Sequence, residues 1–156
     1  MSHYKRILVP VDGSETSNKA LVQALQLARD GGAQVRLIHA VDELSYLSGY
    51  EYSGDMVRIA REHGVDLLDQ GLAMAKAAGV AADIKLIEFP GQRLGQVVAD
   101  EAREWQADLV VLGTHGRRGM SRLMLGSGAE QIIRLSAVPV LVVPGTPGAP
   151  GVRQGN

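Results

Sequence analysis

The residues with the clearest chemical potential lie between Asp108 and Glu130, in the stretch DLVVLGTHGRRGMSRLMLGSGAE. A short apolar run from Leu109 to Leu112 predicts a strand that is covered on both faces. Glycines follow where the backbone must turn, and a residue without a side chain lets the main chain come close to a ligand. These glycines are Gly113, Gly116 and Gly119. The combination indicates a loop built to approach a bound group.

Three arginines and a helix start follow in the same stretch. Ser127 can cap a helix, and Glu130, three residues later, can return a hydrogen bond to the Ser127 amide. A helix N-terminus with free amides beside a glycine loop is an anion site. The arginines are Arg117, Arg118 and Arg122. The order of strand, glycine loop, arginines and helix predicts a phosphate site, although each element alone is also typical of a turn, a solvated side chain or a plain cap.

The composition excludes several other classes of protein. A chain of 156 residues with 46% hydrophobic content predicts one domain with a sizeable core. Sixteen basic and seventeen acidic residues give a net charge of −1, so we expect neither a nucleic-acid nor a membrane partner. The absence of cysteine excludes disulfides and thiolate chemistry. No apolar run suits a signal peptide or approaches the roughly 20 residues of a membrane span, so we expect a soluble, cytoplasmic protein.

Apolar periodicity predicts alternating strands and helices along the chain. We expect strands over residues 7–11, 34–41, 82–89, 109–112 and 137–143, and helices over residues 15–29, 55–78, 94–105 and 131–135. With right-handed crossovers, this order gives an α/β fold, a single doubly wound, five-stranded parallel sheet with helices on both faces. The third strand alternates in polarity and the fifth contains Pro139, so both are expected toward the edges.

The segments between and after these elements carry further expectations. Ser14 is a plausible cap for the first helix, whereas Gly64 and Gly71 are soft points in the long second helix. Residues 43–54 hold three of the four tyrosines and predict a surface loop or a short lid. We expect residues 1–144 to form the domain and the Pro/Gly-rich tail 145–156 to be disordered.

Ligands of such sheets bind at the carboxyl ends of the strands, near the point where the strand order reverses. Asp12 follows the first strand, where it could accept a ribose hydroxyl, hold a magnesium-bound water beside a triphosphate, or cap the next helix. His115, inside the glycine loop, could donate to a phosphate or be solvated. His39 lies within a strand and is expected to be a core residue with its hydrogen bonds satisfied.

The usual motifs of nucleotide enzymes are missing. The turn after the first strand contains only Gly13, so the dinucleotide fingerprint is absent and NAD is disfavoured. A P-loop requires lysine before Ser127, but Gly126 occupies that position. The site therefore predicts a protein that holds a nucleotide and hydrolyses it slowly at most.

The chain resembles the universal stress protein family over nearly its whole folded length. The matching segments are KRILVPVDGSETSNKAL, RLIHAVD, ADLVVLGTHGRRGMSRLMLGSGAEQII and VPVLVV. ATP-binding members of that family have a glycine, two residues, a second glycine, nine residues, and then glycine with serine or threonine. Here the spacing runs from Gly113 and Gly116 to Gly126 and Ser127. The resemblance implies the ATP-binding subgroup and a Rossmann-like fold of the adenine nucleotide alpha hydrolase-like kind.

The resemblance also implies a role for each matching position. Asp12 would contact the ribose, Pro10 and Val11 would lie near the base, and the backbone of Ala40 would read adenine. Gly113 would lie against the ribose. The other positions that the resemblance implies for the ribose and the phosphates are Thr114, His115, Gly116, Arg117, Gly126, Ser127, Gly128 and Ala129.

Three functions remain open on these residues. The first is an ATP-binding, magnesium-dependent stress-response regulator that acts on an unknown protein partner and dimerises through Val140 and Val142 of the fifth strand, as the resemblance implies. The second is a nucleotide hydrolase or phosphotransferase that uses Asp12 and the arginines. The third is a dimeric interaction module that works without nucleotide.

Overall fold

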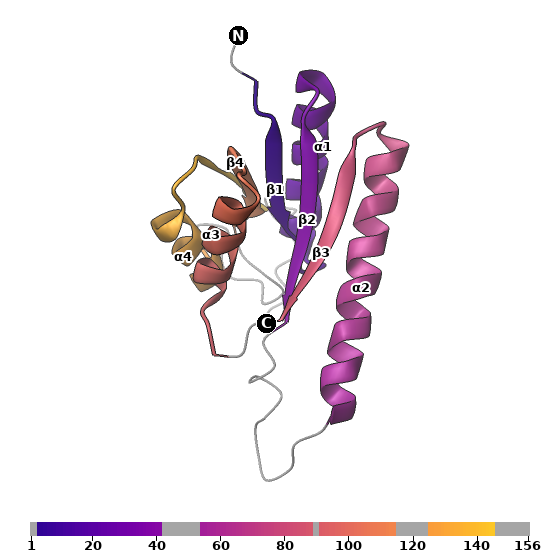
Figure 1. The fold of residues 1–156 in the computed structure, drawn as a ribbon, viewed down its shortest axis with the longest axis vertical. Coiled ribbons are helices and arrows are strands. Elements are labelled where there is room, and N and C mark those ends of the chain that lie inside the picture. Colours follow the sequence, from indigo (N-terminus) through magenta and orange to yellow (C-terminus); the bar gives the residue numbers. More distant parts are fainter. Residues whose placement is uncertain (1–2, 42–53, 89–90, 115–124, 146–156) are drawn as a thin grey trace, which may run out of the picture.

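The computed structural model describes residues 3–41, 54–88, 91–114 and 125–145, and shows five strands and four helices in alternation (Figure 1). The strands are β1 Arg6–Pro10, β2 Gln34–Val41, β3 Ala82–Glu88, β4 Leu109–Gly113 and β5 Val140–Val143. The helices are α1 Glu15–Gly31, α2 Gly54–Ala77, α3 Leu94–Glu104 and α4 Ser127–Leu135. Each expected element is present, and its ends lie within four residues of the expected ones.

All five strands are parallel and form one sheet in the order β3-β2-β1-β4-β5. The chain proceeds outward from β1 to β3 and then restarts on the other side of β1 with β4. The strand order therefore reverses between β1 and β4, where the connections leave a crevice at the carboxyl ends. The structure confirms the doubly wound parallel sheet and the edge positions of β3 and β5. Pro139 precedes β5, where its carbonyl accepts a hydrogen bond from the Val110 amide at 3.0 Å.

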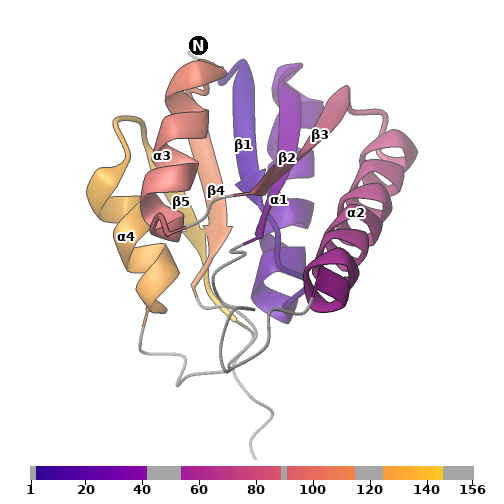
Figure 2. The same ribbon diagram turned by 60° about the horizontal axis from the view of Figure 1, so that its bottom comes forward.

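Helices cover both faces of the sheet in two layers (Figure 2). The α1–α2 layer packs on one face with inward side chains such as Ile7 and Val9. The α3–α4 layer packs on the other face, where Leu8 of the same strand is buried. Alternate residues of β1 thus enter opposite cores, which explains the continuous apolar runs over residues 7–9 in β1 and 109–112 in β4.

Side-chain and glycine caps fix both ends of α1. The Ser14 hydroxyl accepts from the Ser17 amide at 3.2 Å, which confirms Ser14 as the N-cap. Gly32 ends the helix in the left-handed conformation, with φ of 70°. The residues of α1 that face the sheet are Ala20, Leu21, Ala24, Leu25 and Ala28.

The two interior glycines of α2 are contact positions. A Cβ atom at Gly64 would lie 2.6 Å from Cδ2 of His39, and one at Gly71 would lie 2.9 Å from Cδ1 of Leu37. These positions are seven residues apart, so they share one face of a continuous helix. Their lack of side chains lets α2 lie close against β2 and β3.

Several sequence predictions fall on residues that the structure does not describe. These include the tyrosine-rich segment as far as residue 53, most of the glycine-arginine loop, and the tail from residue 146. Gly54 begins α2. Among the helices of the described ranges, none combines the length and hydropathy needed to cross a membrane.

Candidate functional site

A cavity of about 500 Å³ opens where the strand order reverses, at the carboxyl ends of β1, β2 and β4. Figure 2 turns this end of the sheet toward the reader. The volume lies within the range of about 300–1,000 Å³ that is typical of small-molecule sites. Its lining residues are Pro10, Val11, Asp12, Ser14, Thr16, Ser17, Ile38, His39, Ala40, Leu94, Val98, Leu112, Gly113, Leu125, Gly126, Ser127, Gly128, Ala129 and Ile132.

Asp12 lies at the turn between β1 and α1 and is held from both sides. Its Oδ1 atom accepts from the Ser14 amide at 2.8 Å, and its own amide donates to Oγ of Ser17 at 3.1 Å. Ser14 is the helix cap, so the alternative that Asp12 caps α1 is wrong. These bonds fix the direction of the aspartate at the mouth of the cavity.

The first turn of α1 also lines the cavity, which the sequence analysis missed. Thr16 and Ser17 are 4% and 5% exposed, and both line the cavity with Ser14. The signal available in the sequence was the cluster of three hydroxyl residues directly after a strand-ending aspartate. Of these three residues, only Ser14 was predicted to have a role, as the cap of the first helix.

Gly113 ends β4 directly against α1. A Cβ atom there would lie 2.6 Å from Oγ1 and 2.7 Å from the carbonyl carbon of Thr16. No side chain fits at this position without moving the backbone of α1. The glycine therefore brings the end of β4 and the start of α1 together at one side of the cavity.

A hydrogen bond connects the end of β4 to the start of α4. The Gly126 amide donates to the Thr114 carbonyl at 2.7 Å, and the Thr114 amide donates to the Val143 carbonyl at 3.1 Å. Because the Gly126 amide already has an acceptor within the protein, Gly126 lines the cavity but does not offer its amide to a ligand. Thr114 itself is 7% exposed and does not line the cavity.

The start of α4 differs from its prediction. Ser127 is the first helical residue, and the N-cap is Gly126, which makes no side-chain cap hydrogen bond. Glu130 pairs with Arg134 at 2.6 Å, one turn further along α4. The predicted capping box between Ser127 and Glu130 is wrong, because Ser127 already has helical geometry and Glu130 has a partner at i+4. The first amides of a helix have no intrahelical acceptor, and the N-cap residue Gly126 has no side chain to offer them.

Apolar residues from three strands and two helices form the opposite half of the cavity. Val98 of α3 and Ile132 of α4 face Ile38 and Leu112 across it, and all four are at most 3% exposed. The part contributed by α3 was not identified from the sequence, because its apolar spacing is equally typical of a helix that only packs on a sheet.

The structure brings together nine of the residues singled out from the sequence. They are Pro10, Val11, Asp12, Ala40, Gly113, Gly126, Ser127, Gly128 and Ala129. His115, Gly116 and Arg117 lie outside the described residues, as do Arg118 and Arg122. His39 makes a hydrogen bond as expected, since its Nδ1 atom lies 2.7 Å from the Val11 carbonyl, but its prediction as a core residue is wrong, because it is half-buried and lines the cavity.

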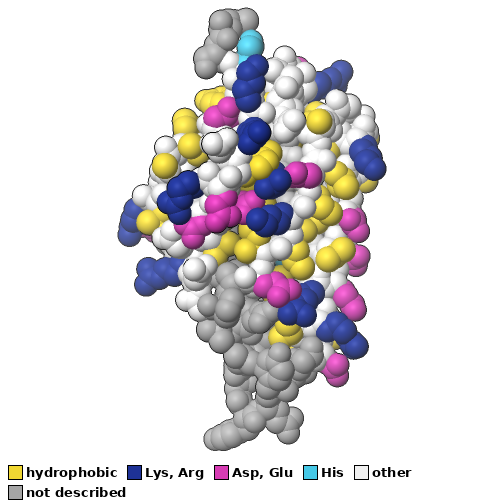
Figure 3. Space-filling model, viewed as in Figure 1, with side chains coloured by type: hydrophobic (Ala, Val, Ile, Leu, Met, Phe, Trp, Pro, Cys, Tyr) yellow, Lys and Arg dark blue, Asp and Glu magenta, His cyan; other side chains and the backbone are white. Residues whose placement is uncertain are grey.

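A charged cluster holds α3 against the sheet beside the cavity. Glu101 of α3 is 4% exposed and accepts from Arg36 at 3.0 Å and from Lys85 at 2.8 Å. The hydrogen bond to Asp83 raises the pKa of Arg36 above its ordinary value, against the lowering effect of burial. Arg36 also lies over the Trp105 ring, 4.8 Å from its centroid. Figure 3, which has the same view as Figure 1, shows basic and acidic side chains side by side in the middle of the molecule.

The fold and the cavity define a doubly wound α/β protein with a ligand site at the carboxyl edge of its sheet. Residues 3–144 match the model of the universal stress protein family. A universal stress protein of Methanocaldococcus jannaschii is 34% identical over 142 residues, which cover 90% of this chain and 82% of that protein. The chain belongs to the universal stress protein family.

Solved structures agree with this assignment. A universal stress protein family member from Burkholderia pseudomallei is 35% identical with a TM-score of 0.76, and the match covers 92% of this chain and 98% of that one. A universal stress protein in complex with cAMP is 27% identical with a TM-score of 0.64, and the match covers 91% of this chain and 98% of that one.

Proposed function

We propose that this protein binds ATP in the cavity at the carboxyl end of the sheet and acts as a nucleotide-dependent stress-response regulator. The observation that carries the proposal is the division of the cavity into two halves. One half is apolar and buried, whereas the other joins Asp12, Gly113 and the N-terminus of α4. An adenine nucleotide has the same division, with a flat base at one end and an anionic chain at the other.

The proposed nucleotide lies with its base in the apolar half. Ile38 and Val98 would cover the ring, and the Ala40 backbone would provide its polar contacts. Asp12 would accept from the ribose, near the point where Gly113 brings two elements together. This order follows the course of the cavity from β2 across β1 to β4.

The phosphates would meet the start of α4. The amides of Ser127, Gly128 and Ala129 belong to the first helical turn, where orphan N–H groups and the helix dipole favour negative charge. His115, Gly116 and Arg117 are proposed to complete this half from the glycine loop.

Magnesium fits the donor set of this site. Magnesium is usually held by one or two carboxylates together with substrate phosphates and several waters. Asp12 is the single carboxylate in the described lining of the cavity, and it would hold the ion through water. The ion would neutralise part of the phosphate charge.

We propose slow hydrolysis at most, in the cytoplasm. Among the described lining residues, Asp12 and His39 are the only candidates for a general base, and both already take part in hydrogen bonds that shape the β1–α1 turn. The relative in complex with cAMP supports a nucleotide ligand in this family. Because cAMP has a single phosphate and ATP has three, the number of phosphates that the site binds is the first property to test.

The direct test is calorimetry on nucleotide-stripped protein with ATP, ADP, AMP and cAMP, each with and without Mg²⁺. We expect ATP to bind at sub-millimolar concentration, with affinity that falls as phosphates are removed. No binding of any of the four would refute the proposal and favour an interaction module. Steady-state turnover above roughly 1 per second would instead favour a hydrolase or phosphotransferase.

We further propose that two copies pair through β5. This strand is at the sheet edge, its Val140 and Val142 are half-buried, and Leu141 is 37% exposed. An apolar edge strand that lacks a partner is prone to uncontrolled pairing. Sedimentation of the protein and of Val142→Lys should show a dimer that the substitution weakens, and an unchanged sedimentation coefficient would contradict this pairing.

A further inference from the structure

The side chain of His39 on β2 contacts the turn between β1 and α1, which lines the cavity. Its Nδ1 atom lies 2.7 Å from the carbonyl oxygen of Val11, which has no proton to give. Nδ1 must therefore carry the hydrogen, and the imidazole is the donor. Val11 stands between Pro10 and Asp12, and all three line the cavity.

Other bonds hold the same turn, but they act on its amides. The Val11 amide donates to the Ile38 carbonyl at 2.8 Å, and the Asp12 amide donates to Oγ of Ser17 at 3.1 Å. His39 contributes the bond to the Val11 carbonyl. The peptide plane between Val11 and Asp12 is thus fixed at both of its polar atoms.

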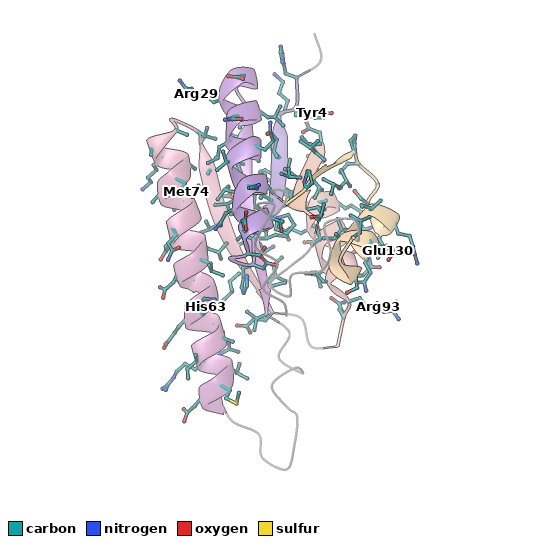
Figure 4. The ribbon with its side chains drawn as sticks, turned by 180° about the vertical axis from the view of Figure 1, so that it is seen from behind. Tyr4, Arg29, His63, Met74, Arg93 and Glu130 are labelled. Carbon is teal, nitrogen blue, oxygen red and sulfur yellow. The ribbon has the colours of Figure 1, made fainter. Side chains whose placement is uncertain are left out.

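Helix α2 holds the imidazole ring from the other side. A Cβ atom at Gly64 would lie 2.6 Å from Cδ2 of His39 and 2.9 Å from Cδ1 of Leu86. His39 and Leu86 are register partners on β2 and β3, so Gly64 lies over both. Figure 4 shows α2 along this side of the sheet, far from Arg93 and Glu130 of the α3–α4 side. The imidazole ring therefore lies between α2 and the end of β1 that lines the cavity.

We propose that His39 is a positioning residue for the nucleotide site. It fixes the Val11–Asp12 peptide and thereby aims the Asp12 carboxylate at the ligand, while Gly64 provides the space for the ring. This inference rests on the proposed function, because the position of Asp12 matters only when a ligand meets it. It assigns a binding role to a residue that has the appearance of an ordinary strand histidine.

The test compares two substitutions by calorimetry with ATP. His39→Leu removes the donor, and we expect ATP affinity to fall about three- to tenfold, the value of one net hydrogen bond. His39→Asn keeps an N–H donor at a similar distance from the backbone, so it should recover most of that loss. Circular dichroism of both variants should match the parent protein.

Gly64→Ala provides an independent route to the same contact. The added methyl group must displace the ring, so this variant should lose affinity as His39→Leu does. Gly31→Ala is the control, because the nearest atom to a Cβ there is Cβ of His3 at 3.6 Å, an ordinary contact distance. Its ATP affinity should equal that of the parent protein.

Nitrogen-15 NMR of the parent protein gives a reading that needs no ligand. It should show His39 protonated at Nδ1, and protonation at Nε2 alone would overturn the inference. Equal affinity of the parent and His39→Leu, or equal loss in His39→Leu and His39→Asn, would also overturn it. A parent protein that binds no nucleotide would refute the proposed function itself, whereas these other outcomes would leave that function standing.

Discussion

The two helical layers pack on opposite faces of the same sheet and differ in the size of their cores and in their share of the cavity. Among the described residues, the core on the α1–α2 side contains sixteen buried residues, and the core on the α3–α4 side contains nine. Ser14 caps α1 with its side chain, whereas the N-cap residues of α3 and α4, Arg93 and Gly126, make no side-chain cap hydrogen bond. Within the described part of the chain, the first layer lines the cavity only with the start of α1, whereas the second layer lines it with residues of both α3 and α4, including the N-terminus of α4.

This difference shows how a small domain can separate stability from binding. Buried apolar area stabilises the fold most where side chains interlock, as they do around Leu21, Leu37 and Leu68. A ligand site needs the opposite, namely open volume and unsatisfied polar groups. The salt bridges of Glu101 with Arg36 and Lys85 hold α3 against the sheet, and the cavity stays open beside α3.

The largest expected effect tests the stability of the α1–α2 layer. Leu68→Ala removes a side chain that is 1% exposed, so the free energy of unfolding should fall by about 2–5 kcal/mol. ATP affinity of the folded protein should not change, because Leu68 does not line the cavity. Urea unfolding and calorimetry measure the two quantities. A parallel loss of affinity would show that the layers are not separable.

The next test concerns binding in the α3–α4 layer. Ser127→Asp places a negative charge at the exposed first residue of α4, which favours the helix but repels phosphate. For charges about 4 Å apart we expect a loss of about 1–4 kcal/mol, or roughly fivefold to a thousandfold in ATP affinity. Ser127→Asn is the neutral control of similar size. If both variants lose affinity equally, the hydroxyl rather than the helix end makes the contact.

A smaller effect is expected from the charged cluster. Glu101→Gln leaves Arg36 and Lys85 without their buried carboxylate and should reduce the free energy of unfolding by about 1–3 kcal/mol. Asp83→Asn removes the more exposed partner of Arg36 and should cost about 0–1 kcal/mol. Urea unfolding of the pair gives both values. A larger cost for Asp83→Asn would place the main support of α3 outside Glu101.

The smallest effect concerns the helix caps. Ser14→Ala should destabilise the protein by about 1 kcal/mol, because it removes the side-chain acceptor of the Ser17 amide. Arg93→Ser should stabilise the protein by about 0.5–1 kcal/mol, because it supplies a side-chain acceptor at the N-cap position of α3, where Arg93 makes no cap bond. Thermal unfolding of the two variants should show shifts of opposite sign. The Gly95 amide of α3 already donates to Oε1 of Gln131 at 3.2 Å, so a loss for Arg93→Ser would mean that this bond is a sufficient cap.

The sequence predicted the elements well and their ends less well. Periodicity determines which side of a helix is buried, as the apolar residues of α1 from Ala20 to Ala28 show. It does not determine where a helix starts, so α4 begins four residues before its predicted start and the capping box was wrong. The cap depends on backbone angles at Gly126, which neighbouring structure sets through the Thr114 carbonyl.

The candidate site was predicted in part. Asp12, Gly113 and the start of α4 were identified from the sequence, because strand ends and glycine spacing are local patterns. Val98 of α3 and Thr16 of α1 were not, because their position at the cavity depends on how the helices cross the sheet. The residues of the glycine-arginine loop between 115 and 124 remain a prediction.

The sequence by itself determined the order of strands and helices, the family, and the strand ends at which a ligand would bind. Tertiary structure decided which segments meet there. Gly64 shows the reason, since it looked like a soft point in α2 and is in fact the position where that helix approaches His39. Contacts between residues 25 apart in the chain depend on strand register and helix packing, and no local pattern of side chains contains that information.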